Sequence, residues 1–168
     1  MTTDRVAMFE SELEGVSTVH RTAAGDFAET LSDATREPAV GTALPVEDIS
    51  LADTPVETDP SPAAIEAAET GVTPAGLGVA NYGTVTLPAS EEPREIISLY
   101  CTRHVAVLAE SDIVADMPAA YDRLAGEFQA GTDTQILATG PSSTADMGEL
   151  LEGVHGPHET HLVVVTDR

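Results

Sequence analysis

Short apolar runs alternate with helical segments along most of this 168-residue chain. Strands are expected at residues 16–20, 38–44, 84–87, 104–109 and 135–139, with a further strand through His161. Helices are expected at residues 4–13, 26–34, 62–70 and 116–128, where capping residues or apolar spacings of three and four mark them. Strands and helices that alternate in this way favour an α/β fold, with three α/β/α layers and a largely parallel sheet.

The length of the chain fits one domain, residues 1–168, with an N-terminal helical region at 1–37 and an α/β core at 38–168. The proline-rich and acidic segment 45–60 is expected to be a solvated connector. A hydrophobic content of 42% with a mean hydropathy of -0.02 is typical of a globular protein. No apolar run approaches the roughly 20 residues of a membrane span, and no export signal precedes the first helix. A cytoplasmic location is expected.

Charge is the most unusual bulk property of the sequence. The 29 acidic residues outnumber seven basic residues, all of them arginine, and give a formal net charge of -22. They are spread over nearly every expected element, which indicates the acidic surface of a halophilic protein, although a cationic partner is an alternative. Nucleic acid is not an expected partner, because its phosphates are bound by clusters of lysine and arginine. In molar salt the Debye length is about 3 Å, so a small anion can still reach local donors.

Cysteine content limits the chemistry that the chain can perform alone. The single cysteine, Cys101, cannot form an intramolecular disulfide or hold an iron–sulfur cluster. Its neighbours Arg103 and His104 leave two interpretations open, a reactive thiol or an ordinary half-buried residue.

The segment 135–165 is the strongest candidate for a functional site. A buried strand leads into the turn Gly140-Pro141-Ser142, and a helix is expected to begin near Ser143 or Thr144. The N-terminus of a helix after a parallel strand binds anions through free amides, and the hydroxyls here would add donors. Ser143 and Asp146 also fit a capping box that needs no ligand. A serine nucleophile elbow is not favoured, because Thr144 occupies the place of its second glycine.

Three histidines, His155, His158 and His161, recur at every third residue. Metal ligation is not favoured, because the Gly156-Pro157 pair breaks any helix that would align the first two imidazoles. General acid–base chemistry or ligand contact by His155 or His161 and a purely structural role both remain open.

The run ATGPSSTADMGELLEGVHGPHETHLVVV resembles the C-terminal signature of the LUD-domain family, in its lactate utilization protein C (LutC) group. Members of that group carry GPSRTADIE, a GVHGP loop and a strand that opens with Leu-His. The segments FESELEGVSTVHR, GVANYGTVTL and HVAVLAESDIVADM also resemble the family, so the likeness covers most of the chain. The N-terminal half is abbreviated, Ser143 replaces the arginine of the signature, and Asn81 and Tyr82 replace the usual acidic residue and threonine.

The resemblance implies a fold similar to the NagB/RpiA/CoA-transferase group. It also implies a non-iron–sulfur component of a system that oxidises L-lactate to pyruvate, with clusters carried by iron–sulfur partner proteins. A small anionic ligand is expected between the loop at Gly83 and Thr84 and the turn that follows residue 139, with His155 or His161 orienting it. The expected ligand-binding residues are Gly83, Thr84, Gly140, Ser142, Ser143, Thr144, Asp146 and Gly156. The alternative is a stand-alone transferase or isomerase that acts on a phosphorylated or CoA-linked substrate; whether the chain is itself catalytic and whether it forms a homo-oligomer are left open.

Overall fold

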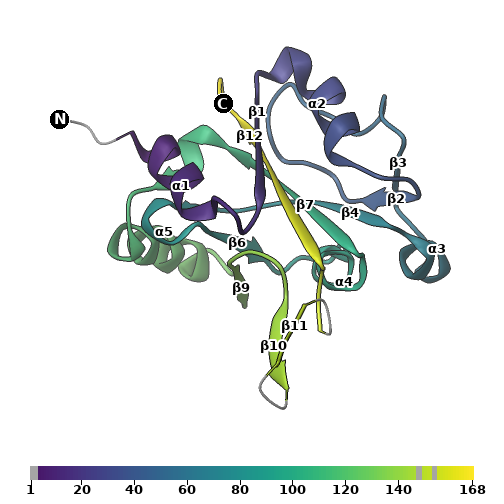
Figure 1. The fold of residues 1–168 in the computed structure, drawn as a ribbon. Helices are drawn as coiled ribbons and strands as arrows, with labels where there is room; N and C mark the ends of the chain where they lie inside the picture. The colour runs from purple at the N-terminus through teal and green to yellow at the C-terminus, as the bar shows by residue number, and fades with distance from the viewer. Residues whose placement is uncertain (1–3, 147–148, 153–154) are drawn as a thin grey trace.

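A computed structural model of the chain describes residues 4–146, 149–152 and 155–168, and their core is a six-stranded, entirely parallel sheet (Figure 1). Across the sheet the strands follow the order β1-β12-β7-β4-β2-β3. Their bounds are Thr18–Thr22 (β1), Ala39–Gly41 (β2), Val56–Thr58 (β3), Thr70–Pro74 (β4), Arg103–Ala109 (β7) and Glu159–Val165 (β12). The first and last strands of the chain are therefore neighbours at one side of the sheet.

Helices cover both faces of this sheet. Because side chains alternate along a strand, Val105 and Val107 of β7 pack on one face with α2 (Phe27–Ala34). Ala106 and Leu108 pack on the other face with α1 (Arg5–Leu13). That second face also carries α3 (Pro62–Ala67) and α4 (Arg94–Tyr100), which enclose the buried Cys101. The structure therefore confirms the predicted layered α/β fold with a largely parallel sheet.

A second sheet of four short strands packs beside α1, in the order β8-β5-β6-β9. Its strands are Gly78–Val79 (β5), Thr84–Pro88 (β6), Ile113–Val114 (β8) and Gln135–Ala138 (β9). Helix α5 (Met117–Gln129) covers part of it through Ala120. Residues 135–139 were expected to belong to the parallel sheet, and this prediction is wrong, because β9 pairs antiparallel with β6.

One expectation about a loop is also wrong. The segment 45–60 is not a solvated connector: Ile49, Leu51 and Val56 are buried under α2, and β3 extends the main sheet. The apolar residues of this segment follow neither a helical nor a strand spacing. Because prolines and acidic residues lie between them, the sequence did not indicate that they are buried. The glycine-rich run after residue 70 begins with the buried strand β4, whose Gly71 leaves room for Ile97 and Cys101.

The helix expected near Ser143 is absent from the described residues at that place. The chain instead forms an antiparallel pair of strands, Ser143–Asp146 (β10) and Glu149–Glu152 (β11), which projects from the body of the molecule (Figure 1). A helix of fewer than ten residues is marginal by itself, whereas strand pairing gives the backbone groups of both segments partners. The predicted helix N-terminus, and the capping box with it, is therefore wrong.

Candidate functional site

A turn at residues 139–143 carries the chain from β9 to β10 and separates two cavities. Gly140 sits in the turn with a φ of +67°, and a Cβ atom there would lie 2.3 Å from Cγ1 of Val16. Only glycine fits this combination of backbone angle and close approach. The amide of Ser142 donates a hydrogen bond of 2.9 Å to the carbonyl of Pro157, which ties the turn to the segment before β12.

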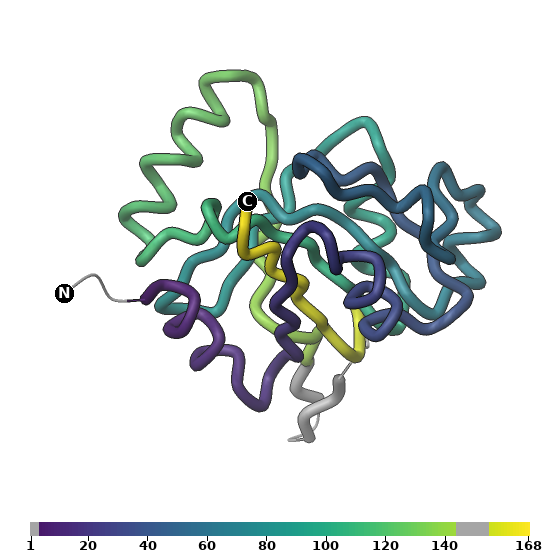
Figure 2. Tube along the Cα trace, turned by 90° about the horizontal axis from the view of Figure 1, so that it is seen from above, coloured from purple at the N-terminus to yellow at the C-terminus, as the bar shows by residue number. Residues whose placement is uncertain are grey.

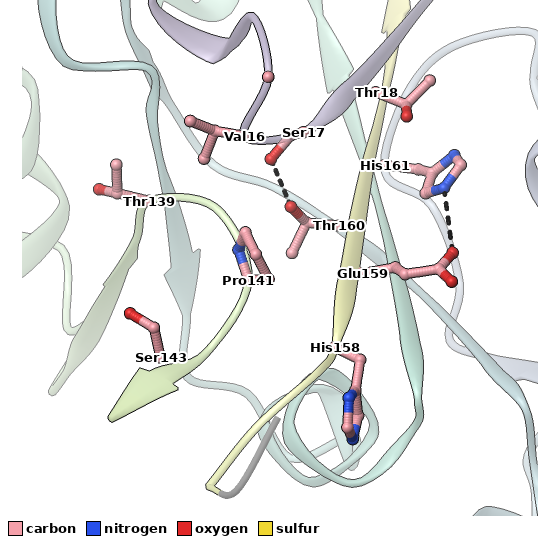
Figure 3. A pocket seen from close by; sticks show the side chains of 11 residues that line it. Val16, Ser17, Thr18, Thr139, Pro141, Ser143, His158, Glu159, Thr160 and His161 are labelled. Atoms are coloured by element: carbon pink, nitrogen blue, oxygen red, sulfur yellow. Dashed lines mark hydrogen bonds and ion pairs between the residues drawn. The ribbon is translucent and has the colours of Figure 1, made fainter. Parts of the chain in front are cut away.

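The larger cavity, of about 620 Å³, lies between this turn and the amino ends of β1 and β12 (Figure 3). Its side chains are rich in hydroxyl groups and imidazoles. They come from Val16, Ser17, Thr18, Thr139, Pro141, Ser143, His158, Glu159, Thr160 and His161, with Gly15 completing the wall. The hydroxyls of Ser17 and Thr160 are hydrogen-bonded to each other, and that of Thr139 pairs with Thr84 at 2.6 Å.

His161 belongs to a chain of polar contacts beside this cavity. Its Nδ1 lies 3.0 Å from Nε2 of His20, and the two rings are nearly parallel, with 16° between their planes. Its Nε2 lies 3.8 Å from Oε2 of Glu159 (Figure 3). A carboxylate at that distance favours the tautomer with the proton on Nε2, which leaves Nδ1 to accept a hydrogen bond from His20. Burial, followed by the charge of Arg103, lowers the pKa of His161 to about 4, so the ring is neutral at pH 7.

Glu159 is held by two arginines. Its Oε2 accepts hydrogen bonds from Nε and Nη2 of Arg103, and its Oε1 accepts one of 3.1 Å from Arg36. The hydrogen bonds from Arg103, more than any other contact, lower the pKa of Glu159. Arg103 is itself buried and donates through Nη1 to the carbonyl of Ala34 at the end of α2. The carboxylate at the edge of the cavity is thus neutralised by fixed cations.

The smaller cavity, of about 240 Å³, lies on the other side of the turn. It brings together four residues that the sequence singled out: Gly140, Ser142, His155 and Gly156. It also reaches the buried His104, whose Nε2 lies 2.8 Å from the hydroxyl of Thr73. Burial lowers the pKa of His104 to about 4, so this imidazole is neutral as well.

The other predicted ligand-binding residues lie at different depths. Gly83 packs against Leu13 of α1, and Thr84 is buried beneath the turn, in contact with Thr139. Ser143 lines the larger cavity. Thr144 and Asp146 fall on β10, and their side chains lie outside the described residues.

Sequence reasoning missed His20, His104, Arg103 and Glu159 as parts of this region. A usable signal existed at Arg103 and His104. These polar residues begin a buried apolar strand, and buried polar side chains need hydrogen-bond partners. His20 carried no such signal, since its contact with His161 depends on the pairing of the first and last strands.

Cys101 is buried, and desolvation, with a smaller contribution from Glu69, raises the pKa of its thiol to about 11. This environment favours an ordinary buried residue over a reactive thiolate. Within the described ranges, no three His, Cys, Asp or Glu side chains gather in a way that could hold a metal ion. No helix in the same part of the chain is long and apolar enough to cross a membrane.

Comparison with known proteins gives three findings. The family model of the LUD domain matches residues 26–165. Lactate utilization protein C of Bacillus velezensis is 36% identical over 107 residues, which cover 61% of this chain and 44% of that protein. The protein of the same name from Bacillus subtilis is 34% identical over 107 residues, covering 61% of this chain and 45% of its own length. The match thus spans less than half of the length of these curated relatives.

A crystal structure of a DUF162 family protein from Deinococcus radiodurans is similar in fold. Its TM-score is 0.67 at 21% sequence identity, and the likeness covers 96% of each chain. Since the domain model covers most of the sequence, including the turn and β12, the chain belongs to the LUD-domain family.

Proposed function

We propose that this chain is the LutC-like, non-iron–sulfur component of a system that oxidises L-lactate to pyruvate, and that it binds a small anion in the larger cavity. The family match and the names of the curated relatives support the lactate system. Because the chain has one cysteine, the redox centres belong to iron–sulfur partner proteins.

The observation that carries the ligand class is the lining of the larger cavity. The hydroxyl of Ser143 and one hydroxyl of the hydrogen-bonded Ser17–Thr160 pair can donate to a carboxylate, while Arg103 and Arg36 offset the charge of Glu159. The position of the family arginine, occupied here by Ser143, lies on the same wall. Neutral His161 orients the ligand through hydrogen bonding and contributes no positive charge.

Reconstitution in molar salt tests the role in lactate oxidation. The two iron–sulfur partner proteins are assayed for L-lactate-dependent dye reduction with this chain, without it, and with the chain after heat denaturation. We expect dye reduction to depend on the native chain. Equal rates of dye reduction in all three mixtures would show that the chain takes no part in the reaction.

A further inference from the structure

The strand order of the main sheet points to a second candidate ligand site. Five of its strands, in the order β3-β2-β4-β7-β12, follow a doubly wound sequence in which the chain winds outward from β2 to β3 and then passes back across β2 to β4. The crossover between β2 and β3 packs with α2 on one face through Ile49 and Leu51. Helix α3, between β3 and β4, packs with α4 on the opposite face. Winding therefore reverses between β2 and β4, and open α/β sheets bind ligands outside the carboxyl ends of their strands at such a point.

A cavity of about 490 Å³ lies outside the carboxyl ends of β2 and β3, beside that point, and is called here the carboxyl-edge cavity. Thr42 directly follows β2, and its amide donates a 3.2 Å hydrogen bond to the carbonyl of Val72 in β4. The wall is formed by Thr42, Ala43, Leu44, Ile49, Ser50, Leu51, Ala52, Thr58, Asp59, Pro60, Glu92 and Pro93. In the view of Figure 2 this part of the chain, in blue, lies across the molecule from α5, in green. The cavities at the turn lie at the amino ends of β1 and β12, so this cavity occupies the opposite edge of the sheet.

The lining defines the chemistry of the ligand. Leu44, Ile49 and Leu51 provide an apolar wall, and Asp59 provides a carboxylate acceptor, whereas the carboxylate of Glu92 is already paired with Arg94. None of the described residues in the wall is basic, which disfavours a phosphate. A ligand that is uncharged, partly apolar and able to donate hydrogen bonds fits this combination.

Asp59 has a particular place in the fold. It directly follows β3, the second strand of the winding, and it lines the carboxyl-edge cavity. In dinucleotide-binding sheets an acidic side chain at the end of the second strand accepts hydrogen bonds from ribose hydroxyls. The same placement here points to a vicinal diol.

Thr42 supplies an independent sign of a ligand. The residue is only 3% exposed, and its hydroxyl has no hydrogen-bond partner among the residues that the structure describes. An unpaired buried hydroxyl costs on the order of 1–3 kcal/mol. Rotation between staggered χ1 positions can turn this group toward a molecule in the cavity.

We propose that the carboxyl-edge cavity binds an uncharged ribonucleoside. The ribose diol donates to Asp59, the base lies against Leu44 and Leu51, and a polar group of the ligand pairs with Thr42. The apolar wall is what distinguishes a nucleoside from a free pentose, which has no base to cover it.

Calorimetric titration in molar salt tests this proposal with adenosine, 2′-deoxyadenosine, ribose and AMP as probes. Adenosine is expected to bind, and loss of the 2′-hydroxyl should weaken binding roughly tenfold or more, as for one hydrogen bond to a charged acceptor. Asp59→Asn should weaken adenosine binding by a similar factor, because asparagine tolerates the φ of +61° at this position. Thr42→Val should weaken adenosine binding without lowering stability, since it removes an unpaired hydroxyl.

The matched control is Asp53→Asn, an exposed residue on the same crossover that does not line the carboxyl-edge cavity, and it should leave adenosine binding unchanged. Absence of adenosine binding at millimolar concentrations would overturn the proposal. So would binding that neither Asp59→Asn nor Thr42→Val weakens. Ribose binding as tightly as adenosine would identify a sugar site, and tighter binding of AMP would identify a phosphate site, and either result contradicts an uncharged ribonucleoside.

Discussion

At the scale of single residues, Gly140 fixes the turn on which both neighbouring cavities depend. We predict that Gly140→Ala lowers the free energy of unfolding by at least about 2 kcal/mol, because it adds a Cβ atom against Val16 at a positive φ. Gly126→Ala, in the exposed middle of α5 with open space around it, should instead raise it by about 0.5–1 kcal/mol. Urea denaturation measures both values. Equal changes in the two variants would show that the turn imposes no constraint.

His104 should make stability depend on pH. Its pKa of about 4 lies below the ordinary value of 6.5, so below pH 6.5 the unfolded chain binds a proton that the folded chain does not. Stability is therefore lost as the pH falls from 6.5 to about 4, by on the order of 3 kcal/mol for this one group. His104→Gln removes the group, and its unfolding free energy should fall less over that window than that of the unaltered chain. Identical pH profiles would contradict a neutral buried imidazole.

At the scale of elements, Arg103 joins α2, β7 and β12. We predict that Arg103→Met costs about 3–5 kcal/mol, because it leaves the Ala34 carbonyl unpaired and removes the main partner of Glu159. The control Arg123→Met breaks an exposed pair with Asp112 and should cost less than about 1 kcal/mol. Chemical denaturation measures the free energy of unfolding of both variants. A small decrease in both would show that the buried Arg103 contributes no more to stability than an exposed ion pair does.

The elements also show what the sequence could predict. Helix α1 begins within one residue of the start that its apolar spacing predicted, and β7 was predicted almost to the residue, because both patterns are local and strong. The pair of strands β10 and β11 was missed because Ser143 and Asp146 satisfy a local helix-start pattern, while strand pairing is not local. Of the candidate site, the sequence located the turn and the loop at His155; it could not reveal the His20–His161 contact, which depends on the topology of the sheet.

At the scale of the whole molecule, the net charge of -22 should make stability depend on salt. We predict that the melting temperature rises most steeply between about 0.01 M and about 1 M KCl, where the Debye length falls from about 30 Å to about 3 Å. Screening of repulsion saturates over this range, whereas salting-out continues to increase with concentration. A melting temperature that is flat below 1 M would contradict an acidic surface adapted to salt.

Titration of the protein with L-lactate and with pyruvate in molar salt is the most direct test of the proposed anion site. We predict binding that Thr160→Val weakens roughly tenfold or more and that Ser143→Arg strengthens, because a guanidinium adds a bidentate carboxylate donor to the larger cavity. The control Thr166→Val makes the same change just beyond the other end of β12, where the hydroxyl donates to the carbonyl of Thr22, and should leave the affinity unchanged. If neither anion binds the unaltered chain or Ser143→Arg, or if Thr160→Val and Thr166→Val behave alike, the cavity beside the turn is not an anion site.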